Sequence, residues 1–376
     1  MKKSEMNWIS YPQKAFNMNT KRNLDIELIR IIACFFVIFN HTGENGFFLF
    51  SLQNRGSVPF WMDLMISIFC KCSVPLFFAI TGALLLDREE SVGRLWRHRI
   101  GRIGAVLLFW SFVYYLDEVR LGWRSFQIGE FAARFFYGDW NLSFWYLYAY
   151  IPLLMTLPLL RKFVKSLTDR EFCYLFLLAF VFLSLLPVLQ YLLWQESHGF
   201  NENFRIDWLC SSIFVYPCLG YFLYSRTDAF WNGKRLALLW LANLAGMAAA
   251  GALTCWQASI TGLLDENHSQ TFFNTFVLIN CAAVFATCRY GMRRISLPEA
   301  AGRRIRSAGS CTLGIYLLHM LFLKRIGATM ALGEVFRRLL GPDSMTGALL
   351  YCAAVFLLGW AVTLVLKRIP LLRRLV

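Results

Sequence analysis

Residues 24–50 read LDIELIRIIACFFVIFNHTGENGFFLF, a stretch long and apolar enough to cross a lipid bilayer. It carries an arginine, Arg30, and eleven residues later a histidine, His41. A charged side chain near the bilayer centre costs about 2.5–3.5 kcal/mol on insertion scales, so such residues usually face a functional interior. On an α-helix this spacing returns to within about 20° of the same face, about 16 Å further along the axis. The stretch therefore predicts a membrane helix with one polar, functional face.

The composition of the whole chain is that of a polytopic membrane protein. Of 376 residues, 57% are hydrophobic and 17% aromatic, and the mean hydropathy is +0.49. The segments that we expect to span the membrane are residues 28–50, 60–86, 103–118, 142–160, 172–193, 209–224, 236–257, 271–288, 309–325 and 348–366. The sequence thus predicts an all-α membrane protein, a bundle of about ten transmembrane helices.

The net charge of +15 follows the predicted topology. With the N-terminus inside, basic residues are about three times as frequent in cytoplasmic segments as in the opposite loops. This alternation predicts that both termini are cytoplasmic and argues against nucleic acid as a partner. We expect a cytoplasmic N-terminal tail (1–23), a transmembrane domain (24–366) and a basic cytoplasmic tail (367–376). No polar segment is long enough for a soluble catalytic domain, so we expect any chemistry to take place within the bundle.

Two histidines are predicted at similar depth in this bundle. His41 is a candidate general base, because a neutral imidazole can take a proton from a hydroxyl group near neutral pH. Glu44 follows three residues later and could orient the His41 ring. His319 lies about ten residues into the ninth predicted span. The two histidines could share a cavity, or each could hydrogen-bond a neighbouring helix.

A basic cluster precedes the third predicted span. Residues 94–102 carry several arginines, of which Arg99 and Arg102 lie one helical turn apart. The planar guanidinium group suits phosphate, so this pair could hold a diphosphate at the inner face. Contact with anionic lipid is the alternative explanation for the cluster. Arg30 is expected near the same face, where Glu27 could neutralise it or where its side chain could reach lipid headgroups.

Other patterns narrow the chemistry. Lys71 and Asp63 in the second span are either a buried ion pair or part of an acceptor groove. The chain has no HExxH, Walker or GxSxG motif and no plausible metal cluster. We therefore expect no metal cofactor and no nucleotide hydrolysis.

Five short motifs occur in a recognisable order along nearly the whole chain. They are Arg30 followed by His41, the Arg99 and Arg102 pair, residues 74–82, residues 144–148 with Pro158 and Arg161, and residues 316–319. In these motifs the chain resembles the integral membrane acyltransferase 3 family, which includes sugar and peptidoglycan O-acetyltransferases. It departs from the family's common pattern in having Glu27 in place of an aspartate and Thr81 in place of a serine.

The resemblance implies transfer of an acyl group, most often acetyl, from cytoplasmic acyl-CoA to an acceptor at the outer side. It implies that Arg99 and Arg102, with Arg30, bind acetyl-CoA or another acyl-CoA. It also implies catalytic roles for His41, Arg30 and Glu44. The residues expected to bind the acceptor or support the site are His319, Tyr316 and Trp145.

A hydroxyl of a cell-envelope carbohydrate, or a lipid-linked acceptor, is the expected acyl acceptor, and membrane lipid is the other expected partner. The expected location is the inner membrane of a bacterium. A transporter or flippase with an intramembrane His/Arg proton or anion site is the main alternative. A membrane sensor or scaffold without turnover is a third interpretation.

Overall fold

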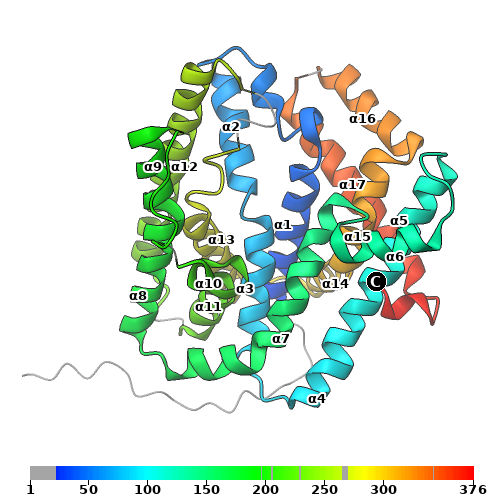
Figure 1. The fold of residues 1–376 in the computed structure, drawn as a ribbon, viewed down its shortest axis with the longest axis horizontal. Coiled ribbons are helices and arrows are strands. Elements are labelled where there is room, and N and C mark those ends of the chain that lie inside the picture. The colour runs from blue at the N-terminus through cyan, green and yellow to red at the C-terminus, as the bar shows by residue number, and fades with distance from the viewer. Residues whose placement is uncertain (1–22, 196, 205, 228–229, 265–269, 342) are drawn as a thin grey trace, which may run out of the picture.

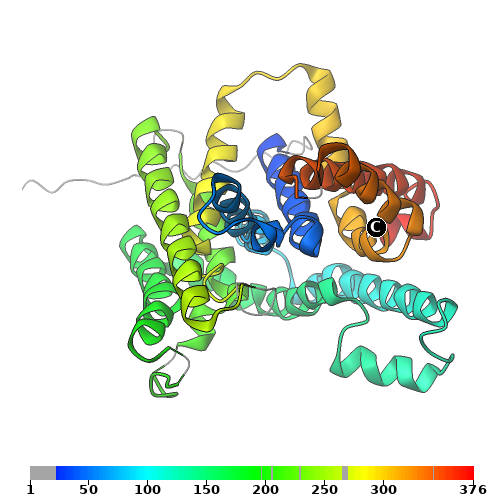
Figure 2. The ribbon, with the colours of Figure 1, turned by 90° about the horizontal axis from the view of Figure 1, so that it is seen from above.

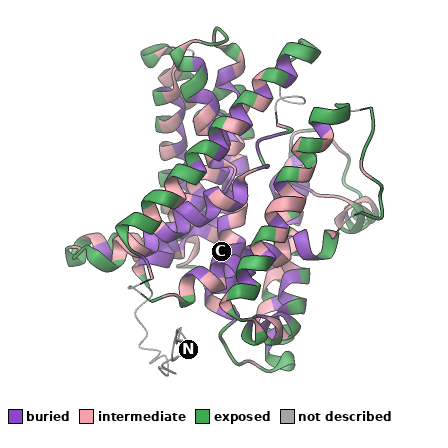
Figure 3. Cartoon of the chain, turned by 90° about the vertical axis from the view of Figure 1, so that its left-hand side faces the viewer, coloured by how far each residue is buried: buried purple, intermediate pink, exposed green. Residues whose placement is uncertain are grey.

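The computed structural model describes residues 23–195, 197–204, 206–227, 230–264, 270–341 and 343–376. Within these ranges every regular element is a helix, and no strand occurs. Figure 1 shows the helices packed side by side as a bundle, and Figure 3 shows buried residues along its interior and exposed residues on its outer faces. The all-α class is therefore confirmed. The predicted N-terminal tail, residues 1–23, lies outside the described residues apart from Asn23.

Helix α1 (Leu24–Asn40) is the centre of the bundle. The helices that pack against it are α2 (Val58–Cys70), α3 (Ser73–Leu85), α13 (Val277–Arg294), α14 (Glu299–Ser310), α15 (Thr312–Lys324) and α17 (Met345–Leu366). The view from above in Figure 2 shows these early and late parts of the chain side by side. Asp25 and Glu27 occupy the first turn of α1, where negative charge is favourable to the helix dipole.

Helix α1 ends ten residues earlier than the predicted first span, 28–50. After Asn40 the chain forms two short helical turns, η1 (Gly43–Asn45) and η2 (Leu49–Leu52). Gly43 has φ +59°, a conformation that favours glycine and stops the helix. The Thr42 hydroxyl accepts a hydrogen bond from the Phe47 backbone N–H at 2.9 Å. The apolar residues 47–50 are buried instead of lining a continuous helix.

Helices α1 and α15 run parallel in a fixed register. The Cys34 thiol lies 3.7 Å from the Thr312 carbonyl, and His41 and His319 meet seven residues further along each helix. The two partners are 278 residues apart in the sequence in both contacts. A single alignment of α1 with α15 therefore accounts for both contacts. The two histidines therefore lie at the same depth of the bundle.

The second predicted span is broken at Lys71 and Cys72, between α2 and α3. Pro75 in the first turn of α3 has no backbone N–H to donate to the end of α2. Two other carbonyls at the end of α2 accept from side-chain amides: Asn280 donates to Phe69 at 2.7 Å and Asn40 donates to Cys70 at 3.1 Å. Asn40 also donates to the Ser73 hydroxyl at 3.0 Å, so it bonds to both sides of the break.

Helix α3 packs very closely against α11 (Ser212–Ser225). A Cβ atom at Gly82 would overlap the Pro217 carbonyl, and a Cβ at Gly220 would overlap the Ala79 carbonyl. Glycine is required at both positions because the obstacle in each case is backbone. Close approach through small residues is a common way for membrane helices to pack.

Six helical segments of the described chain are long and apolar enough to cross a membrane. They are Val58–Leu85, Val92–Arg120, Leu142–Ser166, Asp169–Trp194, Gly233–Thr261 and Met345–Leu366. The pair α15 and α16 (Gly327–Leu340) adds a seventh if its 72° bend falls within one span. The predicted count of about ten is not confirmed, because α1, α11 and α13 are shorter or more polar than this standard requires.

The remaining elements complete these spans or cover the bundle. They are α4 (Val92–Arg94), η3 (Leu95–Ile100), α5 (Gly101–Arg120), α6 (Ile128–Tyr137), η4 (Leu142–Phe144), α7 (Trp145–Ser166), α8 (Asp169–Phe180), η5 (Val181–Leu185), α9 (Leu186–Trp194), α10 (Asp207–Cys210), α12 (Gly233–Thr261) and η6 (Leu372–Arg374). Helix α6 packs on α5 at the edge of the bundle (Figure 2). The cytoplasmic location of the termini stays a prediction.

Candidate active site

His41 and His319 form a pair in the interior of the bundle. His41 caps the C-terminus of α1, and His319 lies in α15. The Nε2 atom of His319 lies 3.3 Å from the Nδ1 atom of His41, and the ring centroids are 5.0 Å apart. His319 is fully buried, whereas His41 is half-buried. The structure thus brings together the two histidines that the sequence predicts at similar depth.

Backbone carbonyls decide which nitrogen of each ring carries the proton. The Val37 carbonyl lies 2.8 Å from His41 Nδ1, and a carbonyl only accepts, so His41 Nδ1–H donates. His319 Nδ1–H donates to the Tyr316 carbonyl in the same way, which leaves His319 Nε2 as an acceptor. His41 Nδ1–H is therefore shared between Val37 and His319. In the neutral His41 ring the lone pair is then on Nε2, which no described residue engages.

Tyr316 supports His319 from one turn earlier on α15. Its carbonyl accepts from His319 Nδ1, and its ring lies 5.7 Å from the His319 ring. Its hydroxyl donates to the Ser143 carbonyl, next to the start of α7. Tyr114 of α5 donates to the Leu317 carbonyl at 2.9 Å, which ties α15 to a second neighbouring helix. Tyr316 is therefore a positioning residue, with its hydroxyl engaged by the protein.

Two of the predicted site residues lie apart from the histidine pair. Glu44 is exposed in η1, and no hydrogen bond joins it to His41 in the described structure. The expected orienting contact fails because α1 ends at Asn40, so Glu44 does not follow His41 on a helical face. Trp145, the first residue of α7, is 46% exposed, and no described contact joins it to either histidine.

Arg30 lies on α1, about 16 Å from His41 by helical rise. Its guanidinium donates to Glu27 at 2.8 Å, as the sequence spacing predicts. Glu27 is buried against Gly309 of α14, where a Cβ atom would overlap the carboxylate. On α7 the Tyr146 ring lies 5.8 Å from the Tyr316 ring, so aromatic contacts extend from the histidine pair to α7.

Arg99 belongs to an ion-pair network that the sequence analysis missed. Its Nε donates to Glu90 at 2.8 Å, and the same carboxylate oxygen lies 3.4 Å from a nitrogen of Arg161. Arg161 is buried in α7 and donates to the Leu85 carbonyl at 2.9 Å. Burial alone would raise the pKa of Glu90, but the hydrogen bonds and charges of Arg99 and Arg161 outweigh burial and hold that pKa below its ordinary value.

Arg102 lies one helical turn after Arg99 and has different partners. Its guanidinium donates to the carbonyls of Arg374 at 3.2 Å and Val376 at 3.5 Å. Trp110 of α5 donates to the Leu375 carbonyl at 2.9 Å, so the last residues of the chain lie along this helix. No hydrogen bond or ion pair joins Arg30 to Arg99 or Arg102 within the part of the chain that the structure describes.

Lys71 and Asp63 do not form the ion pair that was one of two predictions for them. Asp63 accepts a hydrogen bond from the Gln53 amide at 3.0 Å. Lys71 donates to the Gln270 side-chain oxygen at 2.5 Å and lies 4.7 Å from the centre of the Phe47 ring. Asp63 and Lys71 are eight residues apart, a rise of about 12 Å on a continuous helix, so each side chain has a nearer partner.

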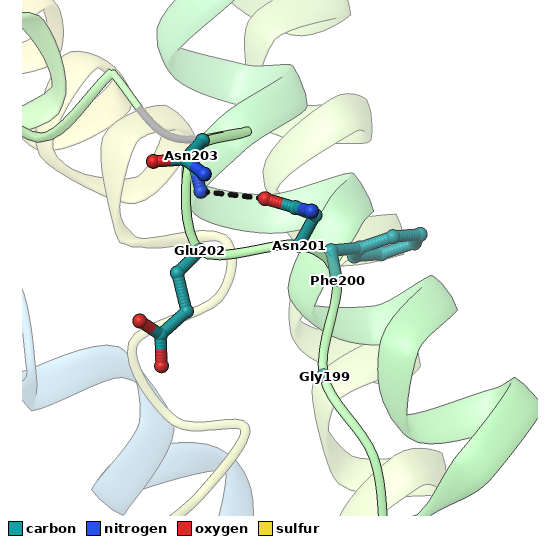
Figure 4. A pocket seen from close by; sticks show the side chains of 5 residues that line it. All are labelled: Gly199, Phe200, Asn201, Glu202 and Asn203. Carbon is teal, nitrogen blue, oxygen red and sulfur yellow. Dashed lines mark hydrogen bonds between the residues drawn. The ribbon is translucent and has the colours of Figure 1, made fainter.

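Two surface hollows lie on the other side of the bundle. Figure 4 shows the smaller one, in which Asn203 donates to the Asn201 side chain at 2.9 Å while Glu202 points away from both. It is lined by five consecutive residues, 199–203, that bring no chemical groups from other helices. The larger groove of about 570 Å³ lies between α9, α10 and residues 271–275. Neither hollow is lined by a histidine or an arginine.

The comparison with protein families identifies the class of protein. The model of the acyltransferase 3 family, described as an acyltransferase domain, matches residues 23–364. Because the match covers nearly the whole chain, this protein belongs to that family of membrane acyltransferases. No curated protein and no solved structure matches the chain.

Proposed function

We propose that this membrane acyltransferase transfers an acetyl group from cytoplasmic acetyl-CoA to a hydroxyl of a cell-envelope carbohydrate or related acceptor. The proposed location is the inner membrane of a bacterium. The observation that carries the proposal is the 3.3 Å contact between His41 and His319 within the matched region. It gives a fixed, neutral imidazole with a lone pair on His41 Nε2.

In the proposed reaction His41 is the general base. The acceptor hydroxyl gives its proton to His41 Nε2 while its oxygen attacks the thioester carbonyl. The carbon–sulfur bond then breaks, and the leaving CoA thiolate takes the proton from His41 Nε2, which restores the neutral imidazole. The extra positive charge on the His41 ring is stabilised during the reaction because Nδ1–H is shared by the Val37 carbonyl and His319 Nε2.

In this proposal Arg99, Arg102 and Arg30 form the donor site. Arg99 directs only Nε at Glu90 in the described structure, and a guanidinium has five N–H donors. Its remaining donors can therefore bind a phosphate group of CoA, with Arg102 one turn away. Arg30, held by Glu27, lies at the start of the face that leads to His41. The pantetheine arm of CoA is comparable in length to the rise between Arg30 and His41.

Purified protein in detergent with radiolabelled acetyl-CoA tests the proposal. We expect CoA release to fall about 10²–10⁴-fold in His41→Ala, the range typical of a lost general base. His198→Ala is the matched control, because His198 is exposed and its hydrogen-bond partner among the described residues is its neighbour Ser197. Equal activity of wild type and His41→Ala would overturn the assignment. Acceptor movement without CoA consumption would favour the transporter alternative.

A further inference from the structure

Lys71 lies in the break between α2 and α3, at the level of the catalytic pair. Its neighbours on either side of the break, Cys70 and Ser73, are bonded by Asn40, the residue that precedes His41. Its ammonium group faces the Gln270 amide and the Phe47 ring. Phe47 follows His41 by six residues, so the cation–π contact also holds Lys71 near the end of α1.

Capping of α2 does not explain this lysine. A cation at a helix C-terminus can satisfy the last carbonyls and oppose the helix dipole. Here the Phe69 carbonyl is taken by Asn280 and the Cys70 carbonyl by Asn40. The Lys71 ammonium instead extends to Gln270, which belongs to a distant part of the chain.

Lys71 also lacks an anionic partner among the described residues. Its ammonium lies within 4 Å of no carboxylate there, and both of its described partners, an amide and an aromatic ring, are neutral. A charged side chain in a membrane span is costly and usually faces a functional cavity or pairs with an opposite charge. A hydrogen bond and a cation–π contact offset only part of that cost.

Lys324 is a second such cation beyond His319 on α15. It is exposed at the end of the helix, and no carboxylate in the described structure lies within 4 Å of it. The adjacent Arg325 contrasts with it, because Arg325 lies 3.8 Å from Asp117 and 3.5 Å from Glu118. Neighbouring acids thus neutralise Arg325, whereas Lys324 has no carboxylate partner among the described residues.

We propose that Lys71 and Lys324 bind an anionic group of the acyl acceptor, a carboxylate or a phosphate, and thereby direct the neighbouring hydroxyl to His41 Nε2. This inference rests on the proposed function and narrows the acceptor to an acidic carbohydrate. The two lysines come from separate elements that adjoin the histidine pair: Lys71 lies in the break that Asn40 bonds, and Lys324 follows His319 by five residues on α15. No covalent step occurs at either lysine.

Binding of matched sugars to the purified full chain tests this site. The probes are methyl glucuronide, glucose 6-phosphate and neutral methyl glucoside, and the readout is the shift in unfolding temperature. We expect the carboxylate or the phosphate probe to stabilise the wild type more than the glucoside does. This preference should disappear in Lys71→Gln and Lys324→Gln and persist in Lys71→Arg. Lys234→Gln, an exposed lysine of α12, is the control.

The outcomes separate this inference from the proposed function. In the CoA-release assay both glutamine variants should keep the wild-type KM for acetyl-CoA and raise the KM for an acidic acceptor about tenfold or more. Equal binding of charged and neutral sugars, or a preference that survives Lys71→Gln and Lys324→Gln, would overturn the lysine site. Charge-selective binding without any CoA release would leave the lysine site intact and refute acyl transfer. If Lys71→Gln does not fold, Lys324→Gln alone decides, because Lys324 is exposed.

Discussion

The Nε2 atom of His319 accepts from the same Nδ1–H of His41 that donates to the Val37 carbonyl. This shared proton fixes the tautomer and the plane of the His41 ring. His319 is therefore expected to work through His41 and to have no direct contact with the acceptor.

We predict that His319→Ala lowers kcat about 10-fold to 100-fold, less than His41→Ala does, with the KM for acetyl-CoA unchanged. Without His319, the His41 ring keeps only the Val37 carbonyl as a partner. Steady-state kinetics with purified protein would show the split between kcat and KM. A higher KM for acetyl-CoA in this variant would instead place His319 in the donor site.

We predict that Arg99→Ala and Arg102→Ala raise the KM for acetyl-CoA about tenfold each, with a smaller effect on kcat. Arg97→Ala is the matched control, because Arg97 lies on the same helical segment, is exposed and has no ion pair in the described structure. The measurement is CoA release against acetyl-CoA concentration. Equal effects at the three positions would mean that the arginine cluster serves only membrane topology and lipid contact.

We predict that Glu90→Gln destabilises the protein by about 1–3 kcal/mol, because it leaves the buried Arg161 guanidinium without its carboxylate. Glu89→Gln should have almost no effect, since the Glu89 side chain is 94% exposed and its contact with Lys165 is 3.9 Å long. Unfolding temperatures in detergent compare the two variants. Similar temperatures for both would contradict the structural importance of this network.

The same carboxylate predicts an acid-sensitive contribution to stability. The pKa of Glu90 is lower in the folded protein than its ordinary value of 4.5, because Arg99 and Arg161 outweigh the effect of burial. The stabilisation is therefore complete above that ordinary value and is lost as the pH falls through the lower, folded pKa. Unfolding temperatures of wild type and Glu90→Gln should converge as the pH is lowered from 7 to about 3. A constant difference over this range would contradict the prediction.

We predict that Gly82→Ala and Gly220→Ala each destabilise the bundle by about 1–3 kcal/mol or more, because the added methyl group would overlap a backbone carbonyl of the partner helix. Gly104→Ala is the control, because a Cβ there meets no atom within 4 Å and alanine favours helix. Folded yield and unfolding temperature distinguish the variants. Normal yields of Gly82→Ala would show that α3 and α11 separate easily.

The sequence predicted the features that depend on local pattern. Hydropathy indicated a helical membrane protein, and the spacing of Arg30 and His41 placed both on α1. To predict the contact between His41 and His319, two facts are needed. The positions of the predicted spans give the depth of each residue, but they do not show that α1 packs against α15. A contact across 278 residues has no local signature.

Other features were missed for physical reasons. Hydropathy measures how apolar a segment is, but it does not show whether the segment forms one continuous helix. The predicted first span therefore included residues 47–50, which are buried in short turns. The break at Lys71 and Cys72 lies in a uniformly apolar stretch for the same reason. Glu90 lies in the charged segment after α3, where nothing local distinguishes the acid that meets Arg99 and Arg161 from exposed Glu89.

Asn40 connects the break between α2 and α3 to the histidine pair. It bonds Cys70 on one side of the break and Ser73 on the other, and it is joined to His41 by a single peptide bond. A tilt of α3 relative to α2 must therefore either break one of these two bonds or carry the end of α1 with it. The Asn40 side chain therefore couples the angle between α2 and α3 to the position of His41, the proposed base.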